Sequence, residues 1–179
     1  MDISRAFIAL PCASQSAALL RAGDCSNSFA QHLRWVASNN LHLTLVFLGG
    51  LSATEVQNVC SIIGEVAARF KVFGIRFSKV SLFPAGRRPK VLAALPEESH
   101  ALHKLQSALA ERLQMLGVYQ QRRSYQPHVT LARCKQANAV WPPAAIDLGY
   151  NVAELHLYQS EQTSTGVQYR SLCRATLSQ

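Results

Sequence analysis

Two short stretches of the chain carry the same pattern, His-x-Thr-Leu, one starting at His42 and the other at His128. Alternate side chains of a β-strand point to the same face, so His42 shares a face with Thr44, and His128 with Thr130. An imidazole titrates near neutral pH, and a hydroxyl is a neutral hydrogen-bond donor. Two such strands facing one another would supply an acid, a base and two hydroxyls around one bound anion.

The back of the first strand is apolar. Strict alternation places Leu41, Leu43, Leu45 and Phe47 on the face opposite His42. We therefore expect a strand that is buried on one side and carries polar chemistry on the other.

Facing imidazoles have two common uses, metal binding and proton transfer. Catalytic zinc usually takes three protein ligands, and neither motif has an Asp, Glu or Cys on its front face. In proton transfer, a neutral histidine removes a proton from water while a protonated one gives a proton to the leaving oxygen. The two threonine hydroxyls would donate to the non-bridging oxygens of a phosphate. A five-membered cyclic phosphate suits this chemistry, so we expect neither a metal nor another cofactor.

Composition sets broad limits. The chain has 179 residues, 49% hydrophobic and 16% charged, which is enough for one large domain or two small lobes that share a core. The formal net charge of +8 favours a polyanionic partner such as nucleic acid or a phosphate ester. A generally basic protein without such a partner is the alternative.

The cysteines and the apolar runs indicate in which cellular compartment the protein is expected. The number of cysteines is odd and no C-x-x-C occurs, so the sequence predicts neither a disulfide framework nor a zinc cage. The five are Cys12, Cys25, Cys60, Cys134 and Cys173. The apolar run at residues 6–12 is too short for a signal peptide, and no run reaches the length of a membrane span. A reducing cytoplasm fits best.

Hydrophobic periodicity predicts strands separated by only a few helices. Ser52 and Glu55 form a capping-box pattern before a helix that runs towards Phe70, and a leucine stripe from Leu102 to Leu116 predicts a second helix. A short helix is expected at residues 14–20, followed by a loop at 24–28. Strands are expected near residues 5–10, 41–48, 72–83, 90–95, 127–133, 152–159 and 167–177.

The order of elements repeats, with one His-x-Thr-Leu motif in each half, which indicates a weak internal duplication. We expect an α+β fold over residues 1–179, a single bilobal domain of two mainly antiparallel sheets with helices outside. A pseudo-twofold relation would then place one motif strand from each lobe at a central cleft.

With its two His-x-Thr-Leu motifs, the sequence resembles the two-histidine phosphoesterase superfamily. Within that superfamily it resembles the bacterial RNA 2′,3′-cyclic phosphodiesterases, also called 2′-5′ RNA ligases. The resemblance extends over nearly the whole chain. It is carried by Arg5–Pro11, Trp35, Asn40–Gly49, Phe83, Pro84, Val91, Tyr125–Arg133, Leu157–Ser160, Gly166 and Tyr169.

The resemblance implies metal-independent hydrolysis of an RNA 2′,3′-cyclic phosphate end to a 2′-phosphomonoester. It implies that His42 is the proton donor, that His128 is the proton acceptor, and that Thr44 and Thr130 hold the phosphate. The expected partner is RNA with a cyclic phosphate end, with transfer-RNA fragments among the candidates. No membrane and no obligate protein partner are expected, and the chain is expected to be a monomer.

The chain departs from the family pattern in places. Ala93 stands where the family often has a large side chain, which puts the binding of the terminal base in doubt. Tyr125 replaces the usual Phe. Arg133 matches a family arginine, yet alternation turns it away from His128, so it reaches the site only if the strand twists or bulges. Otherwise Arg133 packs on the back of the strand, and both readings stay open.

Other residues have both a functional and a structural interpretation. Phe83 and Tyr125 could stack on a base or pack in the core. Two basic loops could hold RNA backbone or be solvated; they contain Arg87, Arg88, Lys90, Arg122 and Arg123. The remaining histidines are expected to have a structural role or to lie on the surface; they are His32, His100, His103 and His156.

Three other functions remain open. The same site run backwards would ligate a cyclic phosphate end to a 5′-hydroxyl. A small cyclic nucleotide or a nucleotide-sugar cyclic phosphate could be the substrate. A non-catalytic RNA-binding module would also be basic and aromatic, but would not need two imidazoles with adjacent hydroxyls.

Overall fold

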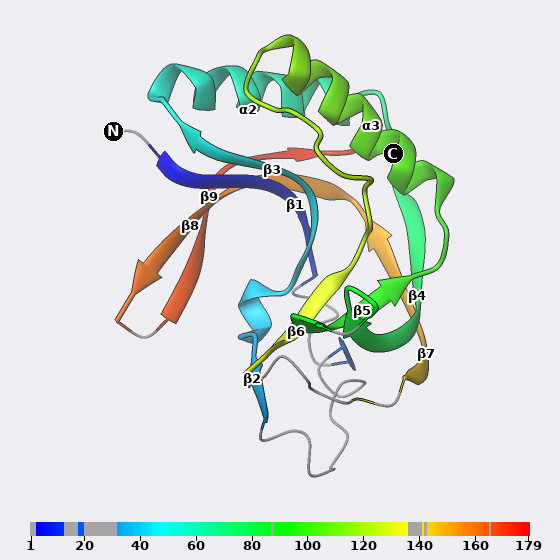
Figure 1. The fold of residues 1–179 in the computed structure, drawn as a ribbon. Helices are drawn as coiled ribbons and strands as arrows, with labels where there is room; N and C mark the ends of the chain where they lie inside the picture. The colour runs from blue at the N-terminus through cyan, green and yellow to red at the C-terminus, as the bar shows by residue number, and fades with distance from the viewer. Residues whose placement is uncertain are drawn as a thin grey trace.

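A computed structural model gives the fold of the chain (Figure 1). It describes residues 3–12, 18–19, 32–86, 88–135, 141, 143–164 and 166–179. Apart from residues 18 and 19, which are helical, the helix predicted at 14–20 and the loop predicted at 24–28 lie outside the described residues, as does Arg87.

The strands of the described chain form one antiparallel sheet in the order β7-β4-β5-β6-β3-β1-β8-β9, and β2 pairs with β6. Their bounds are β1 Ile3–Pro11, β2 Leu33–Trp35, β3 His42–Leu51, β4 Phe73–Phe83, β5 Val91–Pro96, β6 Val129–Cys134, β7 Ala144–Val152, β8 Glu154–Thr163 and β9 Gly166–Thr176. A short 3-10 turn, η3, occupies Ser38–Asn40 just before β3.

The sheet consists of two halves that meet between β3 and β6. One half is β3, β1, β8 and β9; the other is β7, β4, β5 and β6. The halves are joined through a single residue pair, Leu43 with Val129. The α+β class and the two antiparallel halves were predicted correctly, although the pair at the junction makes them parts of one curled sheet.

Two helices cover one face of the sheet side by side, as Figure 1 shows. The first, α2, spans Ala53–Ala67 and starts at the predicted capping box, in which Ser52 and Glu55 bond to each other's backbone N–H. The second, α3, spans His100–Met115 and is capped by Ser99. It ends before Gly117, whose φ of +81° is a conformation that L side chains rarely adopt.

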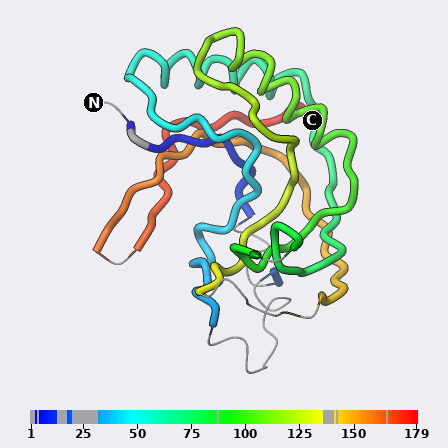
Figure 2. Tube along the Cα trace, viewed as in Figure 1, coloured from blue at the N-terminus to red at the C-terminus, as the bar shows by residue number. Residues whose placement is uncertain are grey.

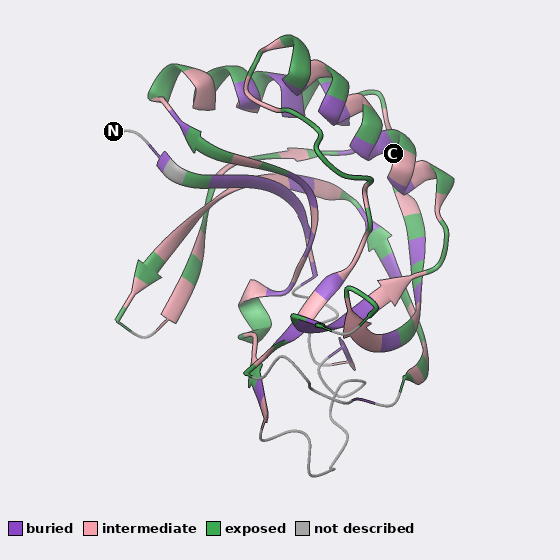
Figure 3. Cartoon of the chain, viewed as in Figure 1, coloured by how far each residue is buried: buried purple, intermediate pink, exposed green. Residues whose placement is uncertain are grey.

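The hydrophobic core lies between these helices and the sheet. The helix faces turned towards the sheet are buried, and the outer faces are exposed (Figure 3). The fully buried side chains include Ile63 of α2 together with Leu102, Leu105, Leu109 and Leu113 of α3. Among the described residues, no helix has the length and apolar character needed to cross a membrane.

Two strands were not predicted. The sequence suggested one strand at 152–159, but the chain makes a long excursion through β7 and then β8, broken only at Ala153. This pair of strands carries the chain from one half of the sheet to the other, which can be followed in Figure 2. The short β2, Leu33–Trp35, pairs with β6, and the sequence pattern gave no strand there.

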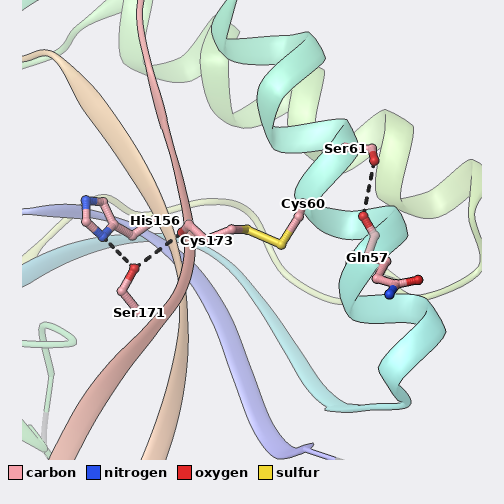
Figure 4. The surroundings of a disulfide bond; sticks show 6 residues. All are labelled: Gln57, Cys60, Ser61, His156, Ser171 and Cys173. Atoms are coloured by element: carbon pink, nitrogen blue, oxygen red, sulfur yellow. Dashed lines mark hydrogen bonds between the residues drawn. A yellow bond between two sulfur atoms is a disulfide. The ribbon is translucent and has the colours of Figure 1, made fainter.

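The prediction that no disulfide would form was wrong. Cys60 of α2 is bonded to Cys173 of β9, with Cα atoms 6.1 Å apart (Figure 4). Cysteine spacing cannot reveal this pair, because the two residues are 113 positions apart and meet only when the helix packs on the sheet. Cys12 and Cys134 are free thiols.

The Cys60–Cys173 bond closes a long loop, so its removal should cost stability. We expect Cys173→Ser to lower the free energy of unfolding by about 2–4 kcal/mol, because the unfolded chain regains the entropy of the open loop. The measurement is chemical denaturation of both proteins without reductant. Cys134→Ser, at a free half-buried thiol, is the matched control. An unchanged midpoint in Cys173→Ser would show that the bond does not form in solution.

Candidate active site

The two His-x-Thr-Leu motifs lie next to each other where the halves of the sheet meet. Leu43 of the first motif pairs with Val129 of the second in antiparallel register. That register places His42 across from Thr130, and Thr44 across from His128. The pattern has local twofold symmetry about the Leu43–Val129 pair, with each imidazole facing the hydroxyl of the other strand.

Both motifs open into one cavity of about 310 Å³, on the face of the sheet turned away from the helices. All four predicted residues, His42, Thr44, His128 and Thr130, line it. The rest of the lining is Arg5, Ala6, Phe7, Val36, Asn40, Phe47, Gly49, Arg133, Ser160 and Tyr169. The structure thus brings the predicted set together, and adds side chains from β1, β8 and β9.

A bulge interrupts the alternation of β3. Ile8 of β1 pairs with Val46, but the next residue, Ala9, pairs with Thr44, so Leu45 is the extra residue. Leu45 and Val46 are consequently both buried. The assignment of Phe47 to the core face was wrong: beyond the bulge its side chain lies on the cavity face and is 69% exposed.

An equivalent bulge interrupts β6. Leu92 of β5 pairs with Ala132, and the next residue, Ala93, pairs with Thr130, so Leu131 is the extra residue. Arg133 therefore lies on the cavity face with His128 and Thr130. Of the two interpretations left open, the one in which a bulge brings Arg133 to the site is correct. In each motif the bulge begins at the Leu of His-x-Thr-Leu, and turns the residue five positions after the histidine into the cavity.

Both imidazoles are held in the same way. His42 Nδ1 lies 2.7 Å from the carbonyl oxygen of Asn40, and His128 Nδ1 lies 2.9 Å from that of Gln126. A carbonyl oxygen only accepts, so Nδ1 must carry a hydrogen in each ring. Nε2 is then the atom at which each ring gains or loses its proton. In both motifs the acceptor is the residue two positions before the histidine.

Aromatic rings pack against both imidazoles. Phe83 stacks on His128 with ring centroids 4.2 Å apart. Phe7 lies 4.9 Å from His42, and Tyr169 of β9 meets the same imidazole edge-on, also at 4.9 Å. These contacts restrict the rotation of both rings. They also give the two histidines different surroundings, because His42 is enclosed on more sides.

Burial of the ring lowers the pKa of His42, the hydrogen bond to the Asn40 carbonyl opposes this, and the charges of His128 and Arg133 lower it again, giving a value of about 4. Burial also lowers the pKa of His128, against its hydrogen bond to the Gln126 carbonyl. His42 is therefore neutral at pH 7 in the free protein. An anion in the cavity would oppose these effects, since it stabilises an imidazolium.

The other predicted contacts lie around the cavity rather than in its lining. Tyr125 is largely buried behind it, and its hydroxyl donates to the carbonyl oxygen of Thr44 at 3.3 Å. Phe83 is occupied by its stack on His128. Ala93 is fully buried and pairs with Thr130, so no large side chain reaches the cavity from this position.

The basic loops and the remaining histidines lie outside the cavity. Arg88, Lys90, Arg122 and Arg123 are exposed and do not line it. The same holds for the four remaining histidines: His32, His100, His103 and His156. In the described part of the chain, no group of three His, Cys, Asp or Glu side chains is arranged to hold a metal ion.

Sequence reasoning gave no role to several lining residues. Asn40 is the clearest case: its backbone oxygen holds His42, and its amide donates to the carbonyl of Val167 in β9 at 2.8 Å. It therefore connects the β8–β9 hairpin to the first motif. Arg5, Phe7 and Tyr169 were quoted for family resemblance alone, because an isolated Arg or aromatic residue in a strand carries no signal of its own.

A profile of the 2′-5′ RNA ligase superfamily matches residues 14–163. The chain belongs to the 2′-5′ RNA ligase superfamily. A relative from Escherichia coli K12, named RNA 2′,3′-cyclic phosphodiesterase, is 32% identical over 146 residues, which are 82% of this chain and 81% of that protein. One of the same name from Bacillus subtilis 168 is 32% identical over 100 residues. That match spans 56% of this chain but only 55% of the relative's length.

Solved structures of this superfamily share the fold. The crystal structure of E. coli LigT complexed with 3′-AMP is 27% identical in sequence and superposes with a TM-score of 0.80. The match covers 99% of each chain. The curled sheet with its two helices is thus a superfamily fold, and the sequence-based recognition of the family is confirmed.

The low pKa of His42 can be tested by titrating the free protein. We expect its imidazole to titrate near pH 4, and inorganic phosphate to raise this pKa because the bound anion stabilises the imidazolium. Histidine ring resonances followed by NMR against pH give both values. Sodium chloride at matched ionic strength is the control. A titration near 6.5 without phosphate would contradict the burial of His42.

Proposed function

We propose that this protein hydrolyses RNA 2′,3′-cyclic phosphate ends to 2′-phosphomonoesters, and that its two histidines perform the proton transfers without a metal. The observation that carries the proposal is the pair of imidazoles in one cavity, each with Nδ1 on a backbone carbonyl and each across from a threonine. This arrangement supplies two groups that exchange protons at Nε2 and two neutral donors for phosphate oxygens.

In the proposed step, His128 Nε2 removes a proton from water as the water oxygen attacks phosphorus. The bond from phosphorus to the 3′-oxygen breaks, and His42 Nε2–H gives its proton to that oxygen. The products are a 2′-phosphate and a free 3′-hydroxyl. One proton is taken and one is given, so the pair ends with its protonation reversed and returns to its starting state through solvent.

Because the pKa of His42 is low, its ring must gain the proton when the substrate binds. The free ring is neutral at pH 7, whereas a proton donor must be charged. An anionic phosphate in the cavity would favour the imidazolium and offset the repulsion from Arg133. Binding and activation are therefore coupled, and the acid forms only where a phosphate lies against it.

The oxygens of the phosphate would be held by Thr44, Thr130 and Arg133. The hydroxyls are neutral donors from opposite strands, and the guanidinium supplies charge where the transition state builds it up. All three side chains line the cavity with the histidines. The bulge in β6 is what allows Arg133 to join them.

The choice of RNA as substrate is supported by charge and by the relatives. The net charge of +8, with Arg5 and Arg133 on the cavity wall, favours a polyanion. The E. coli and B. subtilis relatives are named for RNA 2′,3′-cyclic phosphate hydrolysis. A single domain over residues 1–179 and a monomeric state are parts of the same proposal. The expected cytoplasmic location is not carried over, because it rested on unpaired cysteines and Cys60 is bonded to Cys173.

The direct test is turnover of an oligoribonucleotide ending in a 2′,3′-cyclic phosphate, with EDTA present. We expect a 2′-phosphate product. His42→Ala and His128→Ala should each lower kcat by about 10²–10⁴, because each removes one proton-transfer group. Circular dichroism spectra of the variants, matched to that of the starting protein, control for folding.

Three results would change the account. Hydrolysis retained in the double variant would sink the two-histidine mechanism. A 3′-phosphate product would keep the enzyme but reverse the roles of His42 and His128. Activity confined to small cyclic phosphates would show that the substrate is a small molecule and not RNA.

The threonine hydroxyls can be tested by isosteric substitution. We expect Thr44→Val and Thr130→Val each to lower kcat by about 10²-fold, since each removes one donor to the charge that builds up on phosphate. Thr44→Ser and Thr130→Ser keep the hydroxyl and should stay within a few-fold. Equal activity of the Val and Ser variants would show that the hydroxyls do not contact the phosphate.

The same site could also accept a different nucleophile. If a 5′-hydroxyl of a second RNA replaces water, His128 would deprotonate it and the product would be a 2′-5′ linkage. The superfamily is described as 2′-5′ RNA ligases, so this reaction is the second candidate. Incubation of cyclic-ended RNA with a large excess of 5′-hydroxyl RNA, followed by sizing of the products, separates the two.

A further inference from the structure

Two arginines, Arg34 of β2 and Arg133 of β6, lie directly across from each other on neighbouring strands. The register of β2 with β6 pairs them, and both side chains line the same hollow. Like charges at directly opposed positions of a sheet repel each other. Within the described part of the chain, neither arginine is paired with a carboxylate. An anion between them would turn this repulsion into attraction.

Other arginines of the chain show the usual arrangement. Arg76 is bonded to Asp147, and Arg112 is bonded to Glu65. The charge of each is therefore balanced within the protein. The pair of Arg34 and Arg133 has no such balance, although both side chains are exposed at one place.

The hollow that these arginines line adjoins the catalytic cavity and has a volume of about 330 Å³. Four residues line both spaces: Val36, Asn40, Arg133 and Tyr169. The other walls are Arg34, Trp35, Ala37, Gln162, Gly166 and Val167, so among the described residues no carboxylate lines it. We call it the Arg34 hollow. Its walls come from residues 34–40 on one side and from the β8–β9 hairpin on the other (Figure 1).

The Arg34 hollow opens from the cavity beside His42. Asn40, whose carbonyl holds His42, lines the hollow, and so does Tyr169, which meets the same imidazole edge-on. Because Leu43 and Val129 pair in antiparallel register, the step along β6 from Thr130 to Arg133 leads past His42 and away from His128. The hollow is thus on the side of the proposed proton donor.

The proposed reaction determines which part of the RNA faces this side. His42 gives its proton to the 3′-oxygen, and the 3′-carbon is joined through C4′ to C5′, which carries the phosphate to the preceding nucleotide. The 2′-oxygen stays on phosphorus and leads through C2′ to C1′ and the base. The chain towards the preceding nucleotide therefore leaves the cavity on the side of His42, where the Arg34 hollow opens.

We propose that the Arg34 hollow binds the phosphate on the 5′ side of the terminal nucleotide, with Arg34 as its main ligand. The proposal rests on the proposed function, since it names where the body of the same RNA is held. Arg133 borders both spaces and would lie between this phosphate and the cyclic one. It is three residues beyond Thr130, at most about 10 Å along the strand, which is the scale of one nucleotide.

The consequence is a preference for the end of a polynucleotide over a mononucleotide. A mononucleotide cyclic phosphate without a 5′-phosphate fills only the catalytic cavity and leaves the two arginines unbalanced. An RNA end supplies the second phosphate and balances them. Arg34 is then a specificity-determining residue, because it contacts a part of the substrate that does not react.

The experiment compares adenosine 2′-phosphate with adenosine 2′,5′-bisphosphate, which differ only in the 5′-phosphate. Affinity is measured by isothermal titration, so the readout does not depend on turnover. We expect the bisphosphate to bind about 10-fold more tightly, as one charge-assisted hydrogen bond allows. Arg34→Gln should reduce this gain to less than about twofold. Arg34→Lys should retain part of it, because the ammonium still attracts a phosphate.

Arg170→Gln is the matched control. Arg170 is an exposed arginine of β9 that lines neither the cavity nor the Arg34 hollow. Its substitution removes the same charge from the protein, so the gain from the 5′-phosphate should persist. Circular dichroism spectra of all three variants, matched to that of the starting protein, control for folding.

The outcomes separate this proposal from the proposed reaction. Equal affinity for the two nucleotides in the starting protein would overturn it. A gain that survives Arg34→Gln, or one that is lost equally in Arg170→Gln, would overturn it as well. If the gain depends on Arg34 but cyclic-ended RNA is not hydrolysed, the phosphate site stands and the proposed reaction fails.

Discussion

The site depends on one residue pair, Leu43 with Val129. Both side chains are fully buried, and their pairing is the junction between the two halves of the sheet. Because each lies between a histidine and a threonine, the register of this pair decides which side chains meet across the junction. A slip of one residue would turn either motif over and send its imidazole into the core. Burial of two apolar side chains therefore fixes the geometry of the polar face.

The two bulges are equivalent, but the residues that they turn into the cavity differ and so break the symmetry that this pair creates. Without them the two motifs would present the same imidazole and hydroxyl twice and nothing more. With them, the position five residues after each histidine enters the cavity, as Phe47 in one strand and Arg133 in the other. One supplies an aromatic face and the other a cation. Burial is the main cause that lowers the pKa of His42, and the charges of His128 and Arg133 add to it.

The parts of the structure that follow from local pattern could be predicted from the sequence. The capping box at Ser52 depends on residues a few positions apart, as does the placement of His42 and Thr44 on one face of a strand. The repeat of the motif predicted the cleft. A bulge depends on how one strand meets its neighbour, so alternation alone put Phe47 in the core and left Arg133 undecided. The bond between Cys60 and Cys173 likewise depends on a helix packing on a distant strand, which no local pattern records.

The most direct test of the central claim is a crystal structure with inorganic phosphate bound. The account predicts phosphate at the Leu43–Val129 junction, with the Nε2 atoms of His42 and His128 on opposite sides of phosphorus. The hydroxyls of Thr44 and Thr130 would donate to its oxygens, and both Nδ1 atoms would stay on their backbone carbonyls. A phosphate bound elsewhere, or an imidazole that turns Nδ1 towards it, would contradict the account.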